Sequence, residues 1–284
     1  MRLLVTGAGG LVGRALVQHC TARGDEVIAH DHASLDISVD SLVITALERG
    51  RPEAVINCAA WTDVDGCELD PQRAFAANAL GPANLASACS HIGASLVTIS
   101  TDYVFDGAKK GFYTQRDDPR PLSVYGRVKL EGERRAQNVC ARTTVVRSGW
   151  IFGAGGKNFL SQVVELAERG VRLKAIRDGY GTPTFVLDLA ARLRELAQLD
   201  LPGIYHVVNE GDGTSYEGFV REALRLAGCD GAMVESVTME SLHRPAPRPR
   251  NSRLRCLLSP ALGLAPLPDW RASLKDFVGS GAEG

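Results

Sequence analysis

A tyrosine and a lysine stand one helical turn apart near the middle of the chain. Tyr125 and Lys129 are four residues apart in a segment expected to be helical, so their side chains project from one face. A free phenol has a pKa of roughly 10, and a neighbouring ammonium favours its ionised form. We therefore expect Lys129 to lower the pKa of Tyr125, which would allow proton exchange with a substrate oxygen near neutrality. Lys129 could also hydrogen-bond the ribose of a nicotinamide nucleotide.

A hydroxyl at the end of a predicted strand strengthens this interpretation. Thr101 follows the apolar run 95–100, at the strand end where an open α/β sheet places its ligands. Its hydroxyl can bond the same substrate oxygen that Tyr125 protonates. Tyrosine–lysine pairs at this spacing are common on surface helices, so the prediction of a catalytic set depends on Thr101.

A glycine-rich turn follows the first predicted strand and opens the first predicted helix. Gly7, Gly10 and Gly13 allow a tight turn, close approach of the backbone to a phosphate, and close packing of helix on strand. The helix N-terminus offers N–H groups and a partial positive charge to a pyrophosphate. A purely structural turn does not explain three glycines at this spacing, so the sequence predicts dinucleotide binding.

Polar residues follow the second predicted strand. Asp31 stands about twenty residues beyond the glycines, where a carboxylate holds the adenosine ribose hydroxyls. It favours NAD by repelling a 2′-phosphate, whereas His32 partly offsets that effect. Asp36 and Ile37 are candidates for contact with the adenine, with a solvated loop as the alternative for Asp36. The choice between NADH and NADPH stays open at this point.

Short apolar runs alternate with longer helical patterns in the first half of the chain. Strands are predicted at 3–6, 27–30, 54–57, 95–100 and 143–147, and helices at 11–23, 42–48, 71–91 and 124–138. This succession predicts an α/β fold with a doubly wound parallel sheet of the Rossmann type. After Trp150 the regular alternation of strands and helices ends. Helices are predicted at 158–169, 183–199 and 216–227, and a strand at 203–208.

The end of the strand–helix alternation after Trp150 also predicts two domains. We expect a dinucleotide-binding domain over 1–150 that also receives residues from about 180–210. A smaller, mainly C-terminal substrate-binding domain is expected over 151–284. The proline- and arginine-rich stretch 244–250 is either a solvated linker or a buried segment that places arginines on a ligand.

Composition and charge exclude several classes of protein. The 284 residues carry 32 Lys and Arg against 33 Asp and Glu, a net charge of -1, so neither nucleic acid nor a membrane surface is an expected partner. The uncharged stretch 74–101 contains Asn78 and Pro82 and predicts a buried helix and strand, not a membrane span. The first residues lack the apolar core of a signal peptide. Seven scattered cysteines predict reduced thiols in the cytoplasm and no zinc site.

Longer segments resemble the extended short-chain dehydrogenase/reductases. The glycine turn at 7–13, the sequence STDYVFDG at 100–107 and YGRVK at 125–129 carry this likeness. Other segments resemble one family of that group, the dTDP-4-dehydrorhamnose reductases. They are NCAAWTDVD at 57–65 with Glu68, WIFGAGGKNF at 150–159, GTPT at 181–184, GIYH at 203–206, RPRNS at 248–252 and LPDW at 267–270. The likeness therefore runs from one end of the chain to the other.

The resemblance implies an activity and a set of site residues. The activity is reduction by NADPH or NADH of the 4-keto group of a dTDP-4-dehydro-6-deoxy-sugar, with dTDP-4-dehydro-L-rhamnose as the leading substrate. Tyr125 would be the general acid, Lys129 would orient the coenzyme, and Thr101 would complete the set. The predicted coenzyme-binding residues are Gly7, Gly10, Leu11, Val12, Gly13, Asp31, Asp36, Ile37, Ala59, Ala60, Trp61, Tyr125 and Lys129. The predicted substrate-binding residues are Thr101, Asp102, Trp150, Lys157, Asn158, Arg248 and Arg250, the last four of these for the thymidine diphosphate.

Several alternatives remain at this stage. Trp150 could be buried bulk instead of a sugar contact. The substrate could be another dTDP-4-keto deoxysugar, as in antibiotic or dihydrostreptose pathways. A cofactor-binding regulatory subunit without turnover is a third reading, which the joint presence of Thr101, Tyr125 and Lys129 disfavours. No motif indicates the oligomeric state, and a homodimer is compatible with the sequence.

The chain departs from the family pattern at three positions. Val128 stands where members often have Ser or Thr before the lysine, which removes a helper hydroxyl. Ala15 stands where some members carry a glutamate of an intersubunit magnesium site, so no metal is predicted. Gln115 replaces a glutamate often seen upstream of the tyrosine, which changes a local charge near the site.

Overall fold

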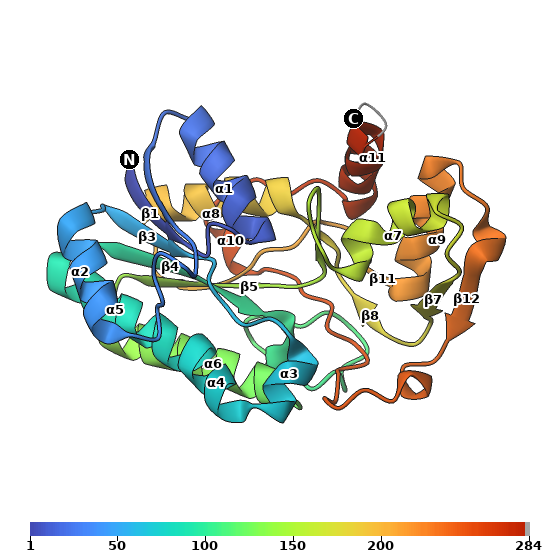
Figure 1. The fold of residues 1–284 in the computed structure, drawn as a ribbon, viewed down its shortest axis with the longest axis horizontal. Helices are drawn as coiled ribbons and strands as arrows, with labels where there is room; N and C mark the ends of the chain where they lie inside the picture. Colours follow the sequence, from blue (N-terminus) through green and yellow to red (C-terminus); the bar gives the residue numbers. More distant parts are fainter. Residues whose placement is uncertain (282–284) are drawn as a thin grey trace.

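A six-stranded parallel sheet forms the centre of the molecule, which a computed structural model describes over residues 1–281 (Figure 1). The strand order is β10-β5-β4-β3-β1-β2, and every neighbouring pair is parallel. The strands are β1 (Arg2–Thr6), β2 (Glu26–His30), β3 (Ala54–Asn57), β4 (Ser95–Thr101), β5 (Thr143–Ser148) and β10 (Gly203–His206). The strand order reverses between β1 and β3, the place where doubly wound sheets open a crevice for ligands.

Helices cover both faces of this sheet. One face carries α1 (Leu11–Ala22) and α8 (Val186–Leu199), and the other carries α2 (Asp40–Gly50), α5 (Gly81–Ile92) and α6 (Val124–Val139). Alternate strand residues point to opposite faces. Leu3 and Val5 thus belong to the cluster around α1 and α8, while Leu4 packs with residues of α2 and α5. The predicted α/β doubly wound sheet is confirmed.

The C-terminal part is built from short strand pairs and helices, on the right in Figure 1. The pairs are β6 (Ile151–Phe152) with β9 (Thr184–Phe185), β7 (Leu173–Ile176) with β12 (Val234–Val237), and β8 (Tyr180–Gly181) with β11 (Thr214–Ser215). The helices of this part are α7 (Phe159–Glu168), α9 (Tyr216–Ala227) and α11 (Trp270–Gly281), whereas the short α10 (Leu258–Ala261) contacts β10 of the central sheet. Within residues 1–281, no helix has the length and hydropathy to span a bilayer.

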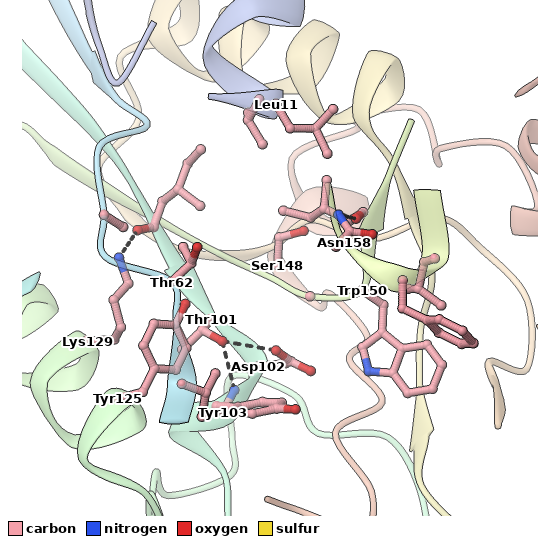
Figure 2. A pocket seen from close by; sticks show the side chains of 18 of the residues that line it. Leu11, Thr62, Thr101, Asp102, Tyr103, Tyr125, Lys129, Ser148, Trp150 and Asn158 are labelled. Carbon is pink, nitrogen blue, oxygen red and sulfur yellow. Dashed lines mark hydrogen bonds between the residues drawn. The ribbon is translucent and has the colours of Figure 1, made fainter. Parts of the chain in front are cut away.

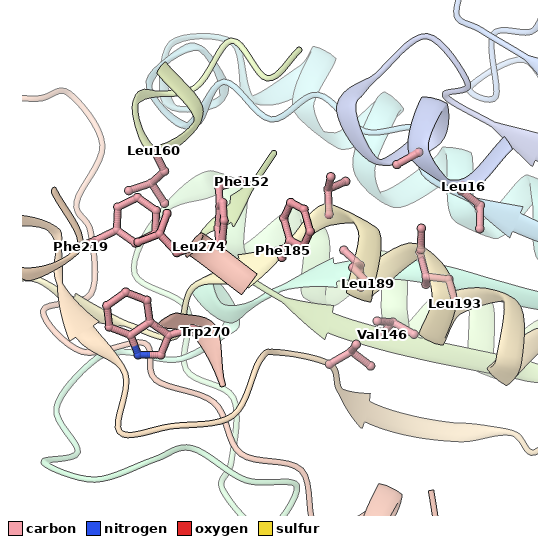
Figure 3. Packing of buried hydrophobic residues seen from close by; sticks show 14 of the residues in the cluster. Leu16, Val146, Phe152, Leu160, Phe185, Leu189, Leu193, Phe219, Trp270 and Leu274 are labelled. Carbon is pink, nitrogen blue, oxygen red and sulfur yellow. The ribbon is translucent and has the colours of Figure 1, made fainter. Parts of the chain in front are cut away.

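One hydrophobic cluster joins the sheet to this C-terminal part. It runs from Leu16, Leu189 and Val146 beside the sheet to Phe152 and Trp270 (Figure 3). The Phe152 ring stacks on Phe185 at 5.4 Å between centroids and meets Phe219 edge-on at 5.2 Å. Aromatic pairs in these geometries stabilise a core beyond their area of burial. The strands of the central sheet and the C-terminal helices therefore share one packed interior.

The predicted helix at 71–91 is interrupted. The structure has α4 (Pro71–Phe75), a π-helical turn (Ala76–Leu80) and then α5. Pro82 has no amide hydrogen to donate to the preceding turn, which favours a local change in the hydrogen-bond pattern. Asn78 lies within the π turn, a kind of irregularity that is frequent at functional sites.

Other element boundaries also differ from the sequence prediction. The helix expected from Pro183 begins at Val186, because Thr184 and Phe185 form strand β9 and the Thr184 N–H donates to the Trp150 carbonyl at 3.1 Å. The strand expected to reach Val208 ends at His206. Helix α3 (Val64–Leu69) was not predicted, although Asp63 caps its first turn by accepting from the Gly66 N–H.

Replacing Phe152 by alanine should destabilise the whole molecule. Phe152 is fully buried, and truncation of such a ring costs about 3–5 kcal/mol of unfolding free energy. Leu69→Ala is the matched control, because Leu69 is 74% exposed and should lose little. Urea unfolding of both variants measures the difference, and a similar loss for the two would contradict a core shared through Phe152.

Candidate functional site

A cavity of about 620 Å³ opens at the carboxyl ends of β1, β3, β4 and β5. Its walls come from the glycine turn, the 58–64 loop, α6, the start of α7, β7 and the 242–244 segment. Figure 2 shows Tyr125, Lys129, Thr101 and Trp150 around this space. The cavity therefore joins the predicted coenzyme turn to the predicted catalytic residues, as the switch point of the sheet requires.

Thr101, Tyr125 and Lys129 lie together on this cavity. The Thr101 hydroxyl donates to Asp102 Oδ1 at 3.0 Å and accepts from the Tyr103 N–H at 3.1 Å. The Lys129 ammonium donates to the Ile99 carbonyl at 2.7 Å, which ties α6 to β4. All three side chains are buried or nearly so, and their arrangement suits proton transfer to an oxygen held in the cavity.

Local sequence places these side chains. Ser123 begins α6 by accepting from the Gly126 N–H at 3.2 Å. A Cβ at Gly126 would stand 2.3 Å from the Tyr103 carbonyl oxygen, so only glycine lets α6 approach the segment after β4 this closely. That approach sets Tyr125 beside Thr101.

Burial dominates the ionisation of the site. It raises the pKa of Tyr125 above its usual range, with hydrogen bonding to Thr101 opposing the rise. The prediction that Lys129 lowers the Tyr125 pKa is therefore wrong in its net direction, since desolvation of the phenolate outweighs the favourable interactions. Burial also lowers the pKa of Lys129 to about 8, although the negative charge of Glu133 opposes this decrease. Burial raises the pKa of Asp102 to about 6. A protonated Tyr125 is the form that can donate a proton.

The glycine turn fits the pyrophosphate of a dinucleotide. Gly7 has a positive φ of 65°, and a Cβ at Gly13 would stand 2.1 Å from the Gly7 carbonyl oxygen. No side chain caps the N-terminus of α1, and no acidic residue lies in its first turn. Gly10, Leu11, Val12 and Gly13 line the cavity with their backbone free to approach a phosphate.

The residues after β2 are placed at different depths. Asp31 is exposed beside the turn, since a Cβ at Gly9 would lie 3.5 Å from the Asp31 Cβ, and its carboxylate accepts from Ser34. Asp36 accepts from the Ser38 hydroxyl at 2.7 Å. Ile37 is buried and packs against Gly81 of α5. None of these three lines the 620 Å³ cavity, so their contacts with a coenzyme stay predictions.

A buried asparagine orients the loop after β3. Asn57 accepts from the Thr6 hydroxyl at 2.6 Å and from the Ala59 N–H at 3.1 Å. Ala59 and Ala60 line the cavity.

A second asparagine holds the next residue of this loop. Asn78 of the π turn exchanges two 2.9 Å hydrogen bonds with the Trp61 backbone. The Trp61 ring itself lies outside the cavity under the guanidinium of Arg73. Sequence reasoning missed Asn78, whose one signal was a polar residue in an uncharged helical stretch.

Trp150 adopts a strained backbone at the cavity wall. Its φ of 51° is rare for a bulky side chain, and such strain concentrates at functional sites. The indole stacks on Tyr216 at 3.7 Å between centroids and covers Gly181, where a Cβ would meet the ring at 2.1 Å. Asp102 is buried on the same cavity, and Asn158 lines it while capping α7.

The cations predicted for the diphosphate lie elsewhere. Lys157 is exposed and does not line the cavity. Arg248 forms an ion pair with Asp65 at 2.8 Å, and Arg250 pairs with Glu240 and Asp178. The cavity instead contains Tyr103, Tyr216, Ser148, Lys174 and Arg244, which the sequence analysis did not assign. Two of them had a sequence signal: Tyr103 lies in the segment STDYVFDG, and Arg244 is the first arginine of the 244–250 stretch.

No group of three or more His, Cys, Asp or Glu side chains that could bind a metal occurs among residues 1–281.

The doubly wound sheet, the glycine turn and the Tyr125–Lys129 pair beside Thr101 define a dinucleotide-dependent oxidoreductase of the extended short-chain type.

Comparison with known proteins narrows this class. The family model described as the RmlD substrate binding domain matches residues 1–282. A dTDP-4-dehydrorhamnose reductase of Streptomyces griseus is 42% identical over 97% of this chain and 92% of the relative. A probable dTDP-4,6-dihydroxy-2-methyloxan-3-one 4-ketoreductase of Streptomyces antibioticus is 38% identical, with coverages of 97% and 94%.

A solved structure agrees with these relatives. The dTDP-4-dehydrorhamnose reductase of Bacillus anthracis in complex with NADP superposes with a TM-score of 0.94 at 32% identity, covering 98% of this chain and 99% of the other. The chain belongs to the dTDP-4-dehydrorhamnose reductase family, as its motifs suggested.

A methyl group at Gly13 should weaken coenzyme binding. The 2.1 Å approach to the Gly7 carbonyl would push α1 away from β1, at a cost of about 1–3 kcal/mol. Gly9→Ala is the control, because its Cβ would make only an ordinary contact with Asp31. Quenching of protein fluorescence by NADPH or NADH measures the affinity; equal affinities for both variants would refute the role of Gly13.

Proposed function

We propose that this chain reduces the 4-keto group of dTDP-4-dehydro-L-rhamnose to form dTDP-L-rhamnose, with NADPH or NADH as the reductant. The observation that carries this proposal is the placement of Tyr125, Thr101 and Lys129 on one cavity with the glycine turn. Relatives that carry the reductase name at 42% identity, and an NADP complex of a structural neighbour, support it.

The residues of the cavity divide the work of the reaction. When bound, the reduced nicotinamide coenzyme would supply the hydride for the carbonyl carbon. Tyr125 donates its proton to the carbonyl oxygen, which becomes the sugar hydroxyl, and its raised pKa keeps it protonated until that step. Thr101 stabilises the negative charge that develops on the oxygen, after its hydroxyl turns from Asp102 to the substrate. Lys129 stabilises the tyrosinate that remains.

Coenzyme-binding roles are proposed for a second group of residues. Gly10, Leu11, Val12 and Gly13 would meet the pyrophosphate, while Ala59 and Ala60 would line the opposite wall. Asp31 would bond the adenosine ribose from its exposed place beside the turn. Asp102, Trp150 and Asn158 would contact the sugar nucleotide from the far wall.

Another dTDP-linked ketone is an alternative to dTDP-4-dehydro-L-rhamnose as the substrate. The Streptomyces antibioticus relative is named for a different dTDP-linked 4-ketone, so another dTDP-4-keto deoxysugar is the alternative substrate. Turnover of both ketones under the same conditions separates the two readings.

The division into domains belongs to the same proposal. Residues 1–150, with about 180–210, would bind the coenzyme, since α8 and β10 complete the layers around the central sheet. Residues 151–284 would bind mainly the sugar nucleotide, and 282–284 lie outside the described residues. A cytoplasmic location agrees with the seven free thiols. A homodimer stays a prediction.

Removal of the phenolic hydroxyl tests the assignment of the acid. Tyr125→Phe should lower kcat about 10²–10⁴-fold, because proton transfer in the transition state is lost. Coenzyme affinity should change little, which fluorescence titration checks. Consumption of NADPH or NADH with freshly prepared dTDP-4-dehydrorhamnose gives the rate. A variant that keeps most of the wild-type rate would remove Tyr125 from its role.

The rate should also fall as pH rises through about 8. Because burial lowers the Lys129 pKa to about 8, the ammonium is charged below that pH and neutral above it. A neutral Lys129 cannot stabilise the tyrosinate that proton donation leaves behind. Profiles of kcat measured over about pH 6–10, a range that spans the Lys129 pKa, should therefore show an alkaline limb, that is, a decrease in rate at high pH. Lys129→Arg, if folded by circular dichroism, should shift that limb upward, and an unchanged limb would assign it to another group.

A further inference from the structure

Lysine and arginine side chains are few on the walls of the 620 Å³ cavity. Among its lining residues the cations are Lys129, Lys174 and Arg244, and the single acid is Asp102. Lys129 is buried at the catalytic end and donates to the Ile99 carbonyl. Two cations therefore remain for a charged part of a substrate.

These two cations approach the cavity from different segments of the C-terminal part. Lys174 lies on β7, at the right in Figure 1, and lines the same cavity as Leu11 at the start of α1. Arg244 lines the cavity together with Tyr103 and Tyr216. Tyr216 in turn stacks on Trp150. The cavity thus passes from the glycine turn and Tyr125 to a cationic end.

Neither cation is strongly engaged within the protein. Arg244 is exposed and forms no hydrogen bond or ion pair among the described residues 1–281. Lys174 is 3.9 Å from Glu235, with both side chains more than half exposed. Such surface pairs contribute little, so an anion would displace this contact at small cost.

Arg248, in the same stretch as Arg244, is fully paired within the protein. Arg248 donates to both Asp65 oxygens, at 2.9 and 2.8 Å, and the Ala246 N–H donates to Asp65 Oδ1 at 3.0 Å. These bonds hold the 244–250 stretch against α3. Asp65 and Arg248 are therefore positioning residues that set the place of Arg244.

We propose that Lys174 and Arg244 hold the diphosphate of the nucleotide sugar, a proposal that rests on the function proposed above. Two adjacent phosphates need cationic donors, and Arg in particular matches phosphate oxygens in a bidentate geometry. Ile176 and Leu242 line the cavity from the same two segments and provide an apolar wall for the nucleoside. The diphosphate at this end leaves the sugar between Trp150 and Tyr125.

Binding of thymidine diphosphate and thymidine to Arg244→Gln and Lys174→Gln tests this assignment by calorimetry. Loss of one charged hydrogen bond should weaken thymidine diphosphate binding about 10–100-fold and leave thymidine and coenzyme affinities near wild type. Arg244→Lys should recover part of the loss. Arg250→Gln is the matched control, because Arg250 pairs with Glu240 and Asp178 outside the cavity lining.

Steady-state kinetics of the same variants separate this assignment from the proposed function. The KM for the sugar nucleotide should rise about 10–100-fold, while kcat at saturation changes by less than about threefold. Wild-type affinity for thymidine diphosphate in Arg244→Gln and Lys174→Gln, or an equal loss in Arg250→Gln, would overturn the assignment. Wild-type protein that binds thymidine diphosphate but turns over neither ketone would overturn the proposed reaction and leave the diphosphate site standing.

Discussion

The hydrogen bond from the buried Lys129 ammonium to the Ile99 carbonyl connects helix α6 to the central sheet. A buried charge is costly unless it is paired and hydrogen-bonded, so this contact restricts where α6 can lie. One turn further along α6, Glu133 accepts from Ser100 of β4 and forms a buried ion pair with Arg147 of β5 at 2.7 Å. Lys129 and Glu133 thus fix the position of α6 relative to β4 and β5. That position places Tyr125, one turn before Lys129, beside the cavity.

The same site depends on close backbone approaches. Gly126 lets α6 reach the segment after β4, and Gly13 lets α1 reach the turn after β1. Gly181 makes room for the Trp150 indole. Each glycine has a different neighbour, but each allows a functional side chain or helix N-terminus to reach the cavity. The strained φ of Trp150 belongs to this pattern, because packing on Tyr216 holds the ring at the cavity wall.

Electrostatics separates the two ends of the cavity. Around Tyr125, burial raises the pKa values of Tyr125 and Asp102 and lowers that of Lys129, so desolvation opposes the ionised form of each group. At the other end, the side chains of Lys174 and Arg244 are exposed to solvent. Reduction of a ketone needs the first environment, and recognition of a diphosphate needs the second.

Local periodicity and spacing were enough to predict the α/β class, the glycine turn and the Tyr125–Lys129 pair. It also predicted Thr101 at a strand end, where parallel strands converge. Which arginines line the cavity could not be predicted in this way, because it depends on contacts between segments far apart in the chain. Arg244, Arg248 and Arg250 belong to one short stretch. Among residues 1–281, Arg244 has no ion-pair partner, whereas Arg248 pairs with an acid of α3 and Arg250 pairs with the acids at positions 178 and 240. Ionisation was decided in the same way: the sequence placed an ammonium near a phenol, but the depth at which both are buried depends on packing from the whole chain.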